Sequence, residues 1–328
     1  KAKTLDWKNF LNFATFMQIF PAHALKNVDG AAYLRDYNFK YLPSTGPYLI
    51  SESDIQKGKS ISLRRRQDYW AEKARRNAGL NNFDEVRLLV VRDENLAFEM
   101  FKKGDLDSFL VGRSKTWVEE LNFDKVQRGL IQKRKVFNNT PQGISGFAMN
   151  TRRKPFDDIR VRKALTFLLN RELMIEKLFY NEYVPMNSYS AVSIYENPSN
   201  PKNVYNPEEA LKLLAEAGWK DRDPQGRLTK DGKPLEIEML YDSKQSETYL
   251  TVYQDDLRKV GINLNLRLVT FETQFKLVGE RQFDVAELGW GAAPFPDPEA
   301  EFHSRLADVN NTDNVTGFKN PKIDEICE

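Results

Sequence analysis

Asp297 and Glu301 are the residues of this sequence with the clearest potential for chemistry. Both follow Trp290-Gly291 in the segment GWGAAPFPDPEAEF (289–302), which is rich in glycine and proline and comes directly after an apolar run. An irregular loop of this kind at the end of a strand commonly faces a cleft and carries binding residues. We therefore expect this loop, with its two carboxylates, to belong to a binding site.

Residues for acid–base catalysis are scarce. The two histidines, His23 and His303, lie in different halves of the chain and in no His-Glu-x-x-His arrangement. We interpret each as a surface or packing residue. The adjacent carboxylates Asp255 and Asp256 point in different directions on a helix, so we interpret them as solvated. The sequence therefore does not predict an enzyme.

Three partial motifs fail at a required position. Gly58-Lys59-Ser60 is similar to the end of a phosphate-binding loop, but Ser53 stands where the first glycine of that loop is required. The run 143–146 is one residue short of a nucleophile elbow. The calcium-loop-like run 221–226 has Gly232 where the bidentate glutamate is required. We expect 221–232 to form a small hairpin, and the sequence predicts no metal site and no cofactor.

Length, charge and cysteine content limit the class of protein. A chain of 328 residues suffices for two domains, and 49 basic against 47 acidic residues give a net charge of +2. This balance favours neither nucleic acid nor an anionic membrane as a partner, and the basic run 64–66 is interpreted as a solvated face. A single cysteine, Cys327, allows no disulfide within the chain. The best candidate for a membrane span, 10–20, is interrupted by polar residues.

The segment 140–180 predicts a strand, a connector and two helices. Its apolar run Phe147-Ala148-Met149 is typical of a buried strand, which is entered through glycines and followed by a polar turn. Asp157-Asp158 favours a helix start, because carboxylates stabilise the positive end of the helix dipole. Apolar residues at 161, 164, 165 and 168 then recur on one helical face, and Asn170 can cap a second helix.

Strands and helices alternate over the rest of the chain. We expect strands at 61–63, 86–91, from 105, 235–239, 262–268 and 283–288, and helices at 94–103, 207–217 and 249–260. The continuous apolar run 86–91 favours a sheet covered on both faces. The strand–helix–strand passages of the second half predict an α/β lobe with parallel pairing.

A family resemblance is carried by the same 140–180 segment. The pattern G-x-x-x-N-T-x-x-x-P-F-D-D-x-R-V-R-x-A-L occupies residues 146–165. It closely resembles the signature of the family 5 extracytoplasmic solute-binding proteins, which are the peptide-, nickel- and oligosaccharide-binding subunits of ABC importers, and is closest to YejA-like oligopeptide binders. The resemblance implies that the segment builds the entry into the second lobe, so most of its residues need not touch ligand.

The resemblance also implies a fold and a domain division. The fold is α/β, of the two-lobed periplasmic-binding-protein kind (type II, Venus flytrap). We expect 1–138 to be the remaining part of lobe one and 139–328 to be the second lobe. Because family members extend further at both ends, we expect a fragment that is truncated at both ends and lacks the C-terminal return crossing.

The loop 289–302 is the second segment of resemblance. Related peptide binders often carry G-W-x-x-D-Y-x-D-P here, with the tryptophan lining the pocket and the first aspartate holding the peptide's amino group. Trp290 and Asp297-Pro298 match, whereas Ala293 stands where that aspartate is expected. Either Asp297 or Glu301 replaces the clamp, or the ligand lacks a free amine. Trp290 itself is either a ligand contact or a buried core aromatic.

Further candidates lie near this loop and near the crossing between lobes. Phe271 aligns with a position that is aromatic in some relatives, and 142–147 is expected where the chain passes between lobes. The full set of expected ligand-binding residues is Trp290, Gly291, Ala293, Asp297, Glu301, Phe271, Gln142, Ser145 and Phe147.

The function implied by the resemblance is capture of an oligopeptide-like ligand in an interlobe cleft and its delivery to the permease subunits of an ABC importer. The protein is expected to be a periplasmic or extracytoplasmic monomer, peripheral to the membrane, with a lipid anchor on sequence that precedes Lys1. The alternative is a ligand-sensing domain of a regulatory or signalling protein that uses the same lobes.

Overall fold

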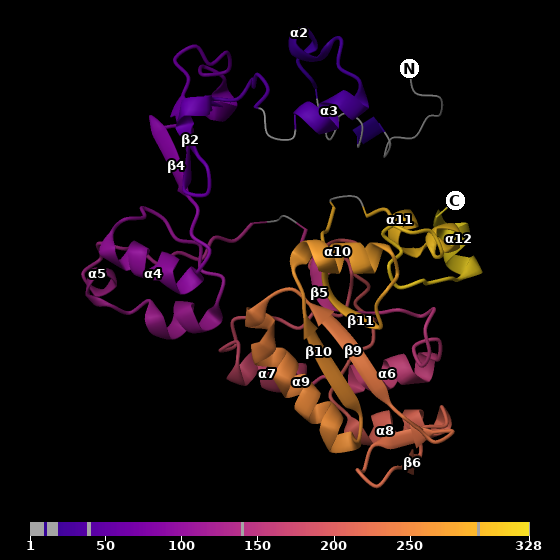
Figure 1. Ribbon diagram of the computed structural model, residues 1–328. Coiled ribbons are helices and arrows are strands. Elements are labelled where there is room, and N and C mark those ends of the chain that lie inside the picture. The colour runs from indigo at the N-terminus through magenta and orange to yellow at the C-terminus, as the bar shows by residue number, and fades with distance from the viewer. Residues whose placement is uncertain (1–9, 12–18, 38–40, 139–140, 294–295, 328) are drawn as a thin grey trace. The chain divides into compact units, whose positions relative to one another are not determined.

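The chain divides into two compact units, Lys1–Leu110 and Val111–Glu328 (Figure 1). The computed structural model describes residues 10–11, 19–37, 41–138, 141–293 and 296–327. Residue 140, at the start of the 140–180 segment, and parts of the 10–20 stretch lie outside the described residues. The expected division between lobes at 138/139 falls inside the second unit. The two units are defined by contacts within each of them and not by where the chain crosses between lobes. The division at 138/139 therefore stays a prediction.

The first unit combines an antiparallel sheet with helices. Its strands are β1 (Tyr48–Leu49), β2 (Ile55–Gln56), β3 (Ser60–Arg65) and β4 (Glu85–Leu89), and its helices include α2 (Ala22–Leu25), α3 (Gly30–Asp36) and α4 (Glu94–Lys103). The central strand, β3, pairs antiparallel with the other three. The predicted helix at 94–103 is confirmed: Asp93 Oδ1 accepts a hydrogen bond from Leu96 N (2.8 Å), and Gly104 ends the helix in the left-handed region.

Two expectations for the first unit are wrong. The run 86–91 predicted a sheet covered on both faces, but Leu88 of β4 is 55% exposed, and Val90, directly after β4, is 51% exposed. Among the described residues β4 pairs only with β3, in an antiparallel sheet, and such a sheet can leave one face open. The strand expected from Asp105 is also not found, since residues 105–111 have turns and irregular backbone.

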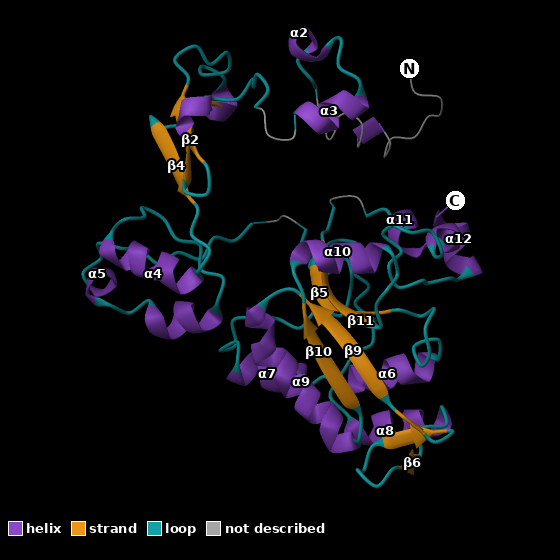
Figure 2. Cartoon of the chain, viewed as in Figure 1, coloured by secondary structure: helices purple, strands orange, loops and turns teal. Residues whose placement is uncertain are grey.

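A mixed four-stranded sheet forms the centre of the second unit (Figure 2). Its spatial order is β10 (Asn263–Leu268), β9 (Glu236–Tyr241), β11 (Val285–Trp290) and β5 (Ile144–Met149). β9 is parallel to β10 and to β11, whereas β5 is antiparallel to β11. The predicted parallel pairing is therefore confirmed. Because the three parallel strands end at one edge of the sheet, the residues that follow them gather at that edge.

Both faces of this sheet are buried. The helices of the unit are α5 (Asp124–Gln127), α6 (Ile159–Phe167), α7 (Arg171–Lys177), α8 (Pro207–Glu216), α9 (Glu247–Val260), α10 (Phe271–Gly279), α11 (Glu299–Phe302) and α12 (Pro321–Cys327). On one face, Ile237 and Met239 pack with residues of α6 to α9. On the other, Leu240 and Ala286 pack with Val278 of α10. None of the described helices is both long and apolar enough to cross a membrane.

The predicted hairpin at 221–232 is confirmed and extended. Strands β6 (Asp221–Arg222), β7 (Leu228–Lys230) and β8 (Lys233–Pro234) form a small antiparallel sheet. Asp231 and Gly232 adopt positive φ angles, as a tight turn between β7 and β8 requires. The run 221–226 is therefore a strand followed by a turn, and no group of three or more potential metal-ligating side chains is found among the described residues.

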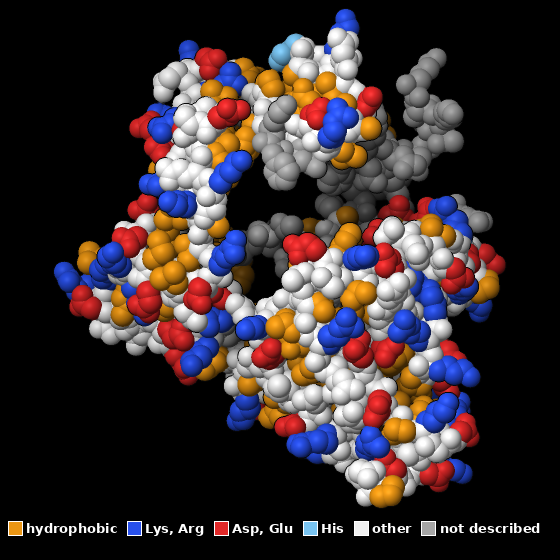
Figure 3. All heavy atoms as spheres, in the orientation of Figure 1, with side chains coloured by type: hydrophobic (Ala, Val, Ile, Leu, Met, Phe, Trp, Pro, Cys, Tyr) orange, Lys and Arg blue, Asp and Glu red, His pale blue; other side chains and the backbone are white. Residues whose placement is uncertain are grey.

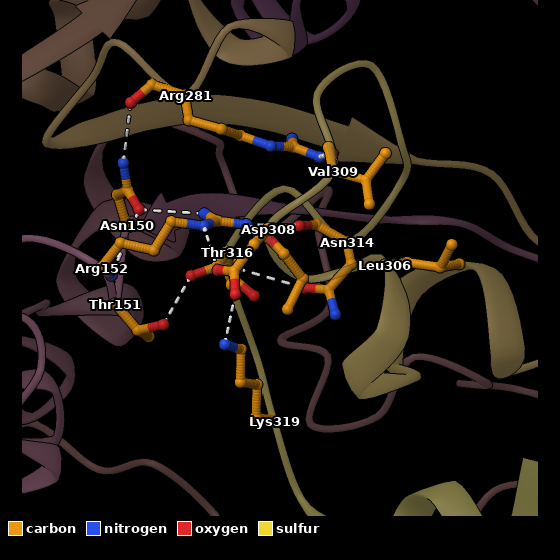
Figure 4. A network of polar contacts seen from close by, with 12 residues as sticks. Asn150, Thr151, Arg152, Arg281, Leu306, Asp308, Val309, Asn314, Thr316 and Lys319 are labelled. Atoms are coloured by element: carbon orange, nitrogen blue, oxygen red, sulfur yellow. Dashed lines mark hydrogen bonds and ion pairs between the residues drawn. The ribbon is translucent and has the colours of Figure 1, made fainter.

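Asn150, the asparagine of the 146–165 pattern, makes buried polar contacts. Asn150, 1% exposed, donates through Nδ2 to the backbone oxygens of Arg281 (3.1 Å) and Phe283 (3.0 Å). Its Oδ1 accepts from Arg152 Nη1 (3.0 Å). Figure 4 shows Asn150 between the two arginines. This amide therefore ties the end of β5 to the backbone that leads into β11.

The C-terminal part of the unit is held by the two residues that follow Asn150. Thr151 Oγ1 donates to Thr316 O (2.7 Å), and Arg152 donates to Asn314 O (3.1 Å) and Val315 O (3.0 Å) (Figure 4). These carbonyls belong to a segment without regular structure, so its position depends on side chains from the end of β5.

The predicted helix starts after 158 and 170 are confirmed. Asp158 Oδ1 accepts a hydrogen bond from Arg160 N (2.9 Å) at the start of α6, and Asn170 caps α7. Arg160 also donates to Glu216 O (2.7 Å), at the end of α8. These contacts are structural, as the resemblance implied for most of the pattern.

Surface charge is mixed. Acidic and basic side chains are interspersed on the visible face of each unit (Figure 3). In the basic run 64–66, Arg64 pairs with Asp54 (2.8 Å), and its two neighbours also pair with nearby aspartates. This run is therefore neutralised locally.

Candidate ligand-binding site

A cavity of about 590 Å³ lies at the edge of the second unit's sheet where the parallel strands end. Asp242 follows β9, Gly291 follows β11, Phe271 begins the helix after β10, and Ser145 lies at the adjacent end of the antiparallel β5. Ligands of open α/β sheets bind at this edge. The lining residues of this acidic cavity are Ser145, Asp242, Phe271, Gln274, Phe275, Val278, Glu287, Leu288, Gly289, Trp290, Gly291, Glu301, Asp313 and Val315.

The walls of the acidic cavity are largely aromatic and aliphatic. Phe271 and Phe275, one helical turn apart on α10, have ring centroids 6.2 Å apart. Trp290 lies edge to face against Tyr189, with centroids 5.9 Å apart, and Tyr189 lies edge to face against Phe302. Trp290 is only partly buried, so it packs on one side and lines the cavity on the other. Trp290 is thus neither fully buried nor free of packing, and its contact with ligand stays a prediction.

Four carboxylates line the acidic cavity: Asp242, Glu287, Glu301 and Asp313. Its lining contains no lysine, arginine or histidine. Burial raises the pKa of Glu287, and the nearby Asp242 raises it further. Burial likewise raises the pKa of Glu301, to which Asp313 also contributes. A cationic ligand group would offset both effects, because an opposite charge favours the ionised carboxylate.

Glu287 is held in place by neighbouring polar groups. Ser246 Oγ donates to Glu287 Oε1 (3.1 Å), and the hydroxyl of Tyr249 donates to the same oxygen. Gln274 Nε2 donates to the backbone oxygen of Glu287 (2.6 Å). The second carboxylate oxygen, Oε2, is buried and has no hydrogen-bond partner within the described part of the chain. Its negative charge is therefore poorly compensated without ligand.

Five of the nine expected binding residues meet at this cavity: Ser145, Phe271, Trp290, Gly291 and Glu301. Gln142, Phe147, Ala293 and Asp297 do not line it.

For two of the four residues outside the cavity, Phe147 and Asp297, the structure shows other contacts. Phe147 stacks on Tyr253 of α9 (centroids 5.4 Å apart), because its side chain belongs to the apolar core on that face of the sheet. Asp297 accepts a hydrogen bond from Glu299 N (3.1 Å) at the start of α11, so it stabilises a helix start. Gln142 and Ala293 are exposed.

Several lining residues were not predicted from the sequence. Glu287 interrupts the apolar run 283–288, and a charge within a buried strand is a usable signal. Phe271, Phe275 and Val278 recur at the spacing of one helical face, a pattern that would have predicted α10. Asp313 carries no such signal, because its position depends on the contacts of Arg152 with the same segment.

Several known proteins that are similar to this chain are named as peptide-binding proteins. The family model described as bacterial extracellular solute-binding proteins, family 5 Middle, matches residues 1–313. The probable peptide-binding protein YejA of Agrobacterium fabrum is 28% identical over 319 residues, which cover 86% of this chain and 52% of the relative. The oligopeptide-binding protein AppA of Bacillus subtilis is 27% identical over 340 residues, covering 100% of this chain and 58% of AppA.

Solved structures agree with this similarity. The structure of AppA from Bacillus subtilis in complex with a nonapeptide superposes with a TM-score of 0.79 at 27% identity, and covers 100% of this chain and 62% of that one. The chain spans about half the length of the curated relatives named above. The predicted fold class is confirmed: the chain has the α/β fold of the periplasmic oligopeptide-binding proteins. Because the family model matches nearly its whole length, the chain belongs to the family 5 bacterial extracellular solute-binding proteins, a family of binding proteins and not of enzymes.

Proposed function

We propose that this chain belongs to an extracytoplasmic solute-binding subunit of an ABC importer, and that it binds an oligopeptide-like ligand in the acidic cavity. The observation that carries the proposal is the cavity itself: aromatic walls and ionisable groups meet at the ligand-binding edge of an α/β sheet. The peptide-binding names of its relatives and the nonapeptide complex of AppA support the choice of ligand.

The lining suits an extended peptide. Gly289 and Gly291 are exposed at the end of β11, so a ligand backbone can approach the protein backbone there. Phe271 and Trp290 supply apolar surface that tolerates different side chains. Binding by such groups requires no covalent step, and any accompanying closure is driven by the tighter affinity of the ligand for the closed form.

The cellular setting is part of the proposal. Delivery to a permease requires release on the outer side of the inner membrane, so we place the protein in the periplasm or its extracytoplasmic equivalent. The family description, which is one of extracellular solute-binding proteins, supports this location.

Calorimetry with a peptide library tests the ligand class. We expect several peptides of different sequence to bind the complete gene product and to raise its unfolding temperature by mass action. Sugars, metal chelates and opines serve as comparison ligands. A response to one of these classes and to no peptide would refute the peptide proposal.

The site is tested with Phe271→Ala. This side chain lines the cavity and is 65% exposed, so its removal should leave the fold intact. We expect peptide affinity to fall about fivefold, equivalent to ~1 kcal/mol for one aromatic contact. Phe137→Ala is the matched control, because Phe137 is 87% exposed in the same unit and does not line the cavity. Equal affinities in the two variants would place the ligand elsewhere.

A further inference from the structure

Arg281 connects two parts of the wall of the acidic cavity. It comes between α10 and β11 in the chain, both of which line that cavity, and it does not line the cavity itself. Its Nη2 donates to the backbone oxygens of Val309 (2.7 Å) and Thr312 (2.9 Å) and to Thr312 Oγ1 (2.7 Å). Figure 4 shows the side chain extending toward Val309. Asp313, which lines the cavity, follows Thr312 directly, so Arg281 holds the segment that carries this carboxylate.

Asp313 is held on both sides of its own position in the chain. Arg281 binds the carbonyl of Thr312, and Arg152 donates to the carbonyl of Asn314 (3.1 Å). Asn314 is fully buried, whereas Asp313 is exposed and lines the cavity. Because this segment has no regular structure, the two arginines supply hydrogen bonds that a helix or a sheet would otherwise provide. The place of the Asp313 carboxylate is therefore set by side chains that do not line the cavity.

The segment also packs directly against the end of α10. Asn311 N donates to Gly279 O (2.9 Å), and a Cβ added at Gly279 would lie 2.4 Å from Asn311 Oδ1. Arg281 and Asn311 both adopt left-handed backbone conformations, with φ angles of 63° and 58°. This conformation is unfavourable for a long side chain such as arginine and persists only where surrounding contacts enforce it. The end of α10 and the segment 309–313 therefore form one closely packed part of the wall.

The positive charge of Arg281 is costly at this place. The residue is 9% exposed, and its Nε has no hydrogen-bond partner within the described part of the chain. Burial lowers the pKa of Arg281, the like charge of Arg152 lowers it further, and Asp313 acts in the opposite direction. An apolar side chain would avoid the cost of burying a charge. What the charge adds, beside the hydrogen bonds to the segment, is attraction to Asp313.

We propose that Arg281 is a positioning residue of the ligand site. By joining the end of α10 to the segment 309–313, it fixes the Asp313 carboxylate relative to the aromatic side chains of Phe271 and Phe275. A carboxylate and aromatic faces both favour a cationic group. The inference rests on the proposed function for the ligand and adds a specificity: peptides with a cationic side chain at this place are preferred. Arg281 acts through Asp313 and touches no ligand atom.

The test uses pairs of peptides that differ in one side chain. Peptides that bind the complete gene product are prepared with lysine at each position in turn, and again with Nε-acetyl-lysine, which lacks the charge. Calorimetry gives the ratio of the two dissociation constants, which we call the lysine preference. In the unmodified protein we expect a preference of about tenfold at one peptide position, because four carboxylates line the cavity.

A double-mutant cycle tests whether Arg281 acts through Asp313. Asp313→Asn and Arg281→Met should each lower the lysine preference about threefold, the contribution of one accessible ion pair. In the Asp313→Asn background, Arg281→Met should lower it no further, because the side chain that Arg281 positions has already lost its charge. An arginine with only a general structural role would instead weaken both peptides of a pair equally and leave the lysine preference unchanged.

Arg227→Met is the matched control for the loss of a structural arginine. Arg227 pairs with Asp223 (2.7 Å) and Glu236 (2.7 Å) in the same unit and does not line the cavity, so its loss should leave the lysine preference unchanged. If Arg281→Met does not fold, Thr312→Val takes its place. It removes the hydroxyl that accepts from Arg281 with little change in size, and should lower the lysine preference about twofold.

The outcomes separate this inference from the proposed function. No lysine preference in the unmodified protein, an unchanged preference in the Arg281 or Thr312 variant, or an equal fall with and without the Asp313 charge would each overturn the inference and leave peptide binding intact. Absence of binding by every peptide would overturn the proposed function and the specificity with it. Hydrogen exchange over 309–315 then measures the positioning alone: Arg281→Met should speed it relative to Arg227→Met, and equal exchange would overturn that part as well.

Discussion

Replacing Asn150 by alanine should destabilise the second unit more than any surface change. The amide is buried and donates to two backbone oxygens, those of Arg281 and Phe283, while its oxygen accepts from the backbone N (3.3 Å) and Nη1 (3.0 Å) of Arg152. Alanine can replace none of these bonds. Both carbonyls would lose a buried donor, whereas Arg152 Nη1 would keep its bond to Val315 O.

The magnitude follows from these bonds. Each carbonyl that loses its donor costs about 1 kcal/mol, and the weaker contacts with Arg152 together with the lost side-chain packing add about 1 kcal/mol more. We therefore expect the free energy of unfolding to fall by about 2–4 kcal/mol. Because Arg152 also holds the segment that contains Asp313 and Val315, which line the acidic cavity, ligand affinity should fall as well.

Urea unfolding with hydrogen-exchange mass spectrometry measures this effect. Exchange in peptides from β5 and β11 reports on the second unit separately from the first, which matters because a protein with two units need not unfold in one step. Asn310→Ala, at an exposed position of the same C-terminal segment, is the control. A loss below about 0.5 kcal/mol, or an equal loss in the control, would refute the view that Asn150 joins β5 to β11.

Two further predictions concern pH and backbone packing. The hydrogen bond from Arg160 lowers the pKa of Asp158 to about 2, so the stability that this pair contributes should be complete above about pH 4, the value of an unfolded aspartate, and be lost as the pH falls toward 2. Asp158→Asn should therefore weaken the dependence of the urea midpoint on pH between pH 4 and 2. If the midpoint of the variant falls with pH as steeply as that of the unmodified protein, the assignment to this pair is contradicted. A Cβ added at Gly143 would lie 2.1 Å from the backbone oxygen of Trp290, so Gly143→Ala should displace that residue, cost about 1–3 kcal/mol and weaken peptide binding. Gly146→Ala, whose added Cβ meets no described atom within 4 Å, is the control, and equal urea midpoints and peptide affinities would disprove the packing argument.

Helices were predicted well from the sequence because their limits are set by local chemistry. The helices α4, α6 and α9 begin or end where caps, acidic residues or glycines were recognised, and their apolar spacing identified the buried face. The exposed strand β4 was misjudged for the opposite reason. An apolar run shows that a strand could be buried, but the number of layers that cover it depends on residues distant in the sequence.

The candidate site was only partly predictable. Trp290, Phe271 and Glu301 were found from the loop and the resemblance, and they do line the acidic cavity. Phe147 could not be assigned to a face of β5 without knowing what packs on each side of the sheet, and it lies in the core against Tyr253. Asp297 is a similar case: it accepts a hydrogen bond from the start of a helix and does not line the acidic cavity. In sequence, a carboxylate in a ligand-binding loop cannot be told from one at a helix start.

The sequence by itself determined the family, the α/β alternation and most helix limits, because capping, periodicity and a long residue pattern are properties of neighbouring residues. Only the tertiary structure decided which charges share a cavity. Glu287, Asp242 and Asp313 come from separate segments that meet where the parallel strands end. Electrostatic interactions depend on distance in space, so the concentration of negative charge in the acidic cavity arises from folding and not from any local motif.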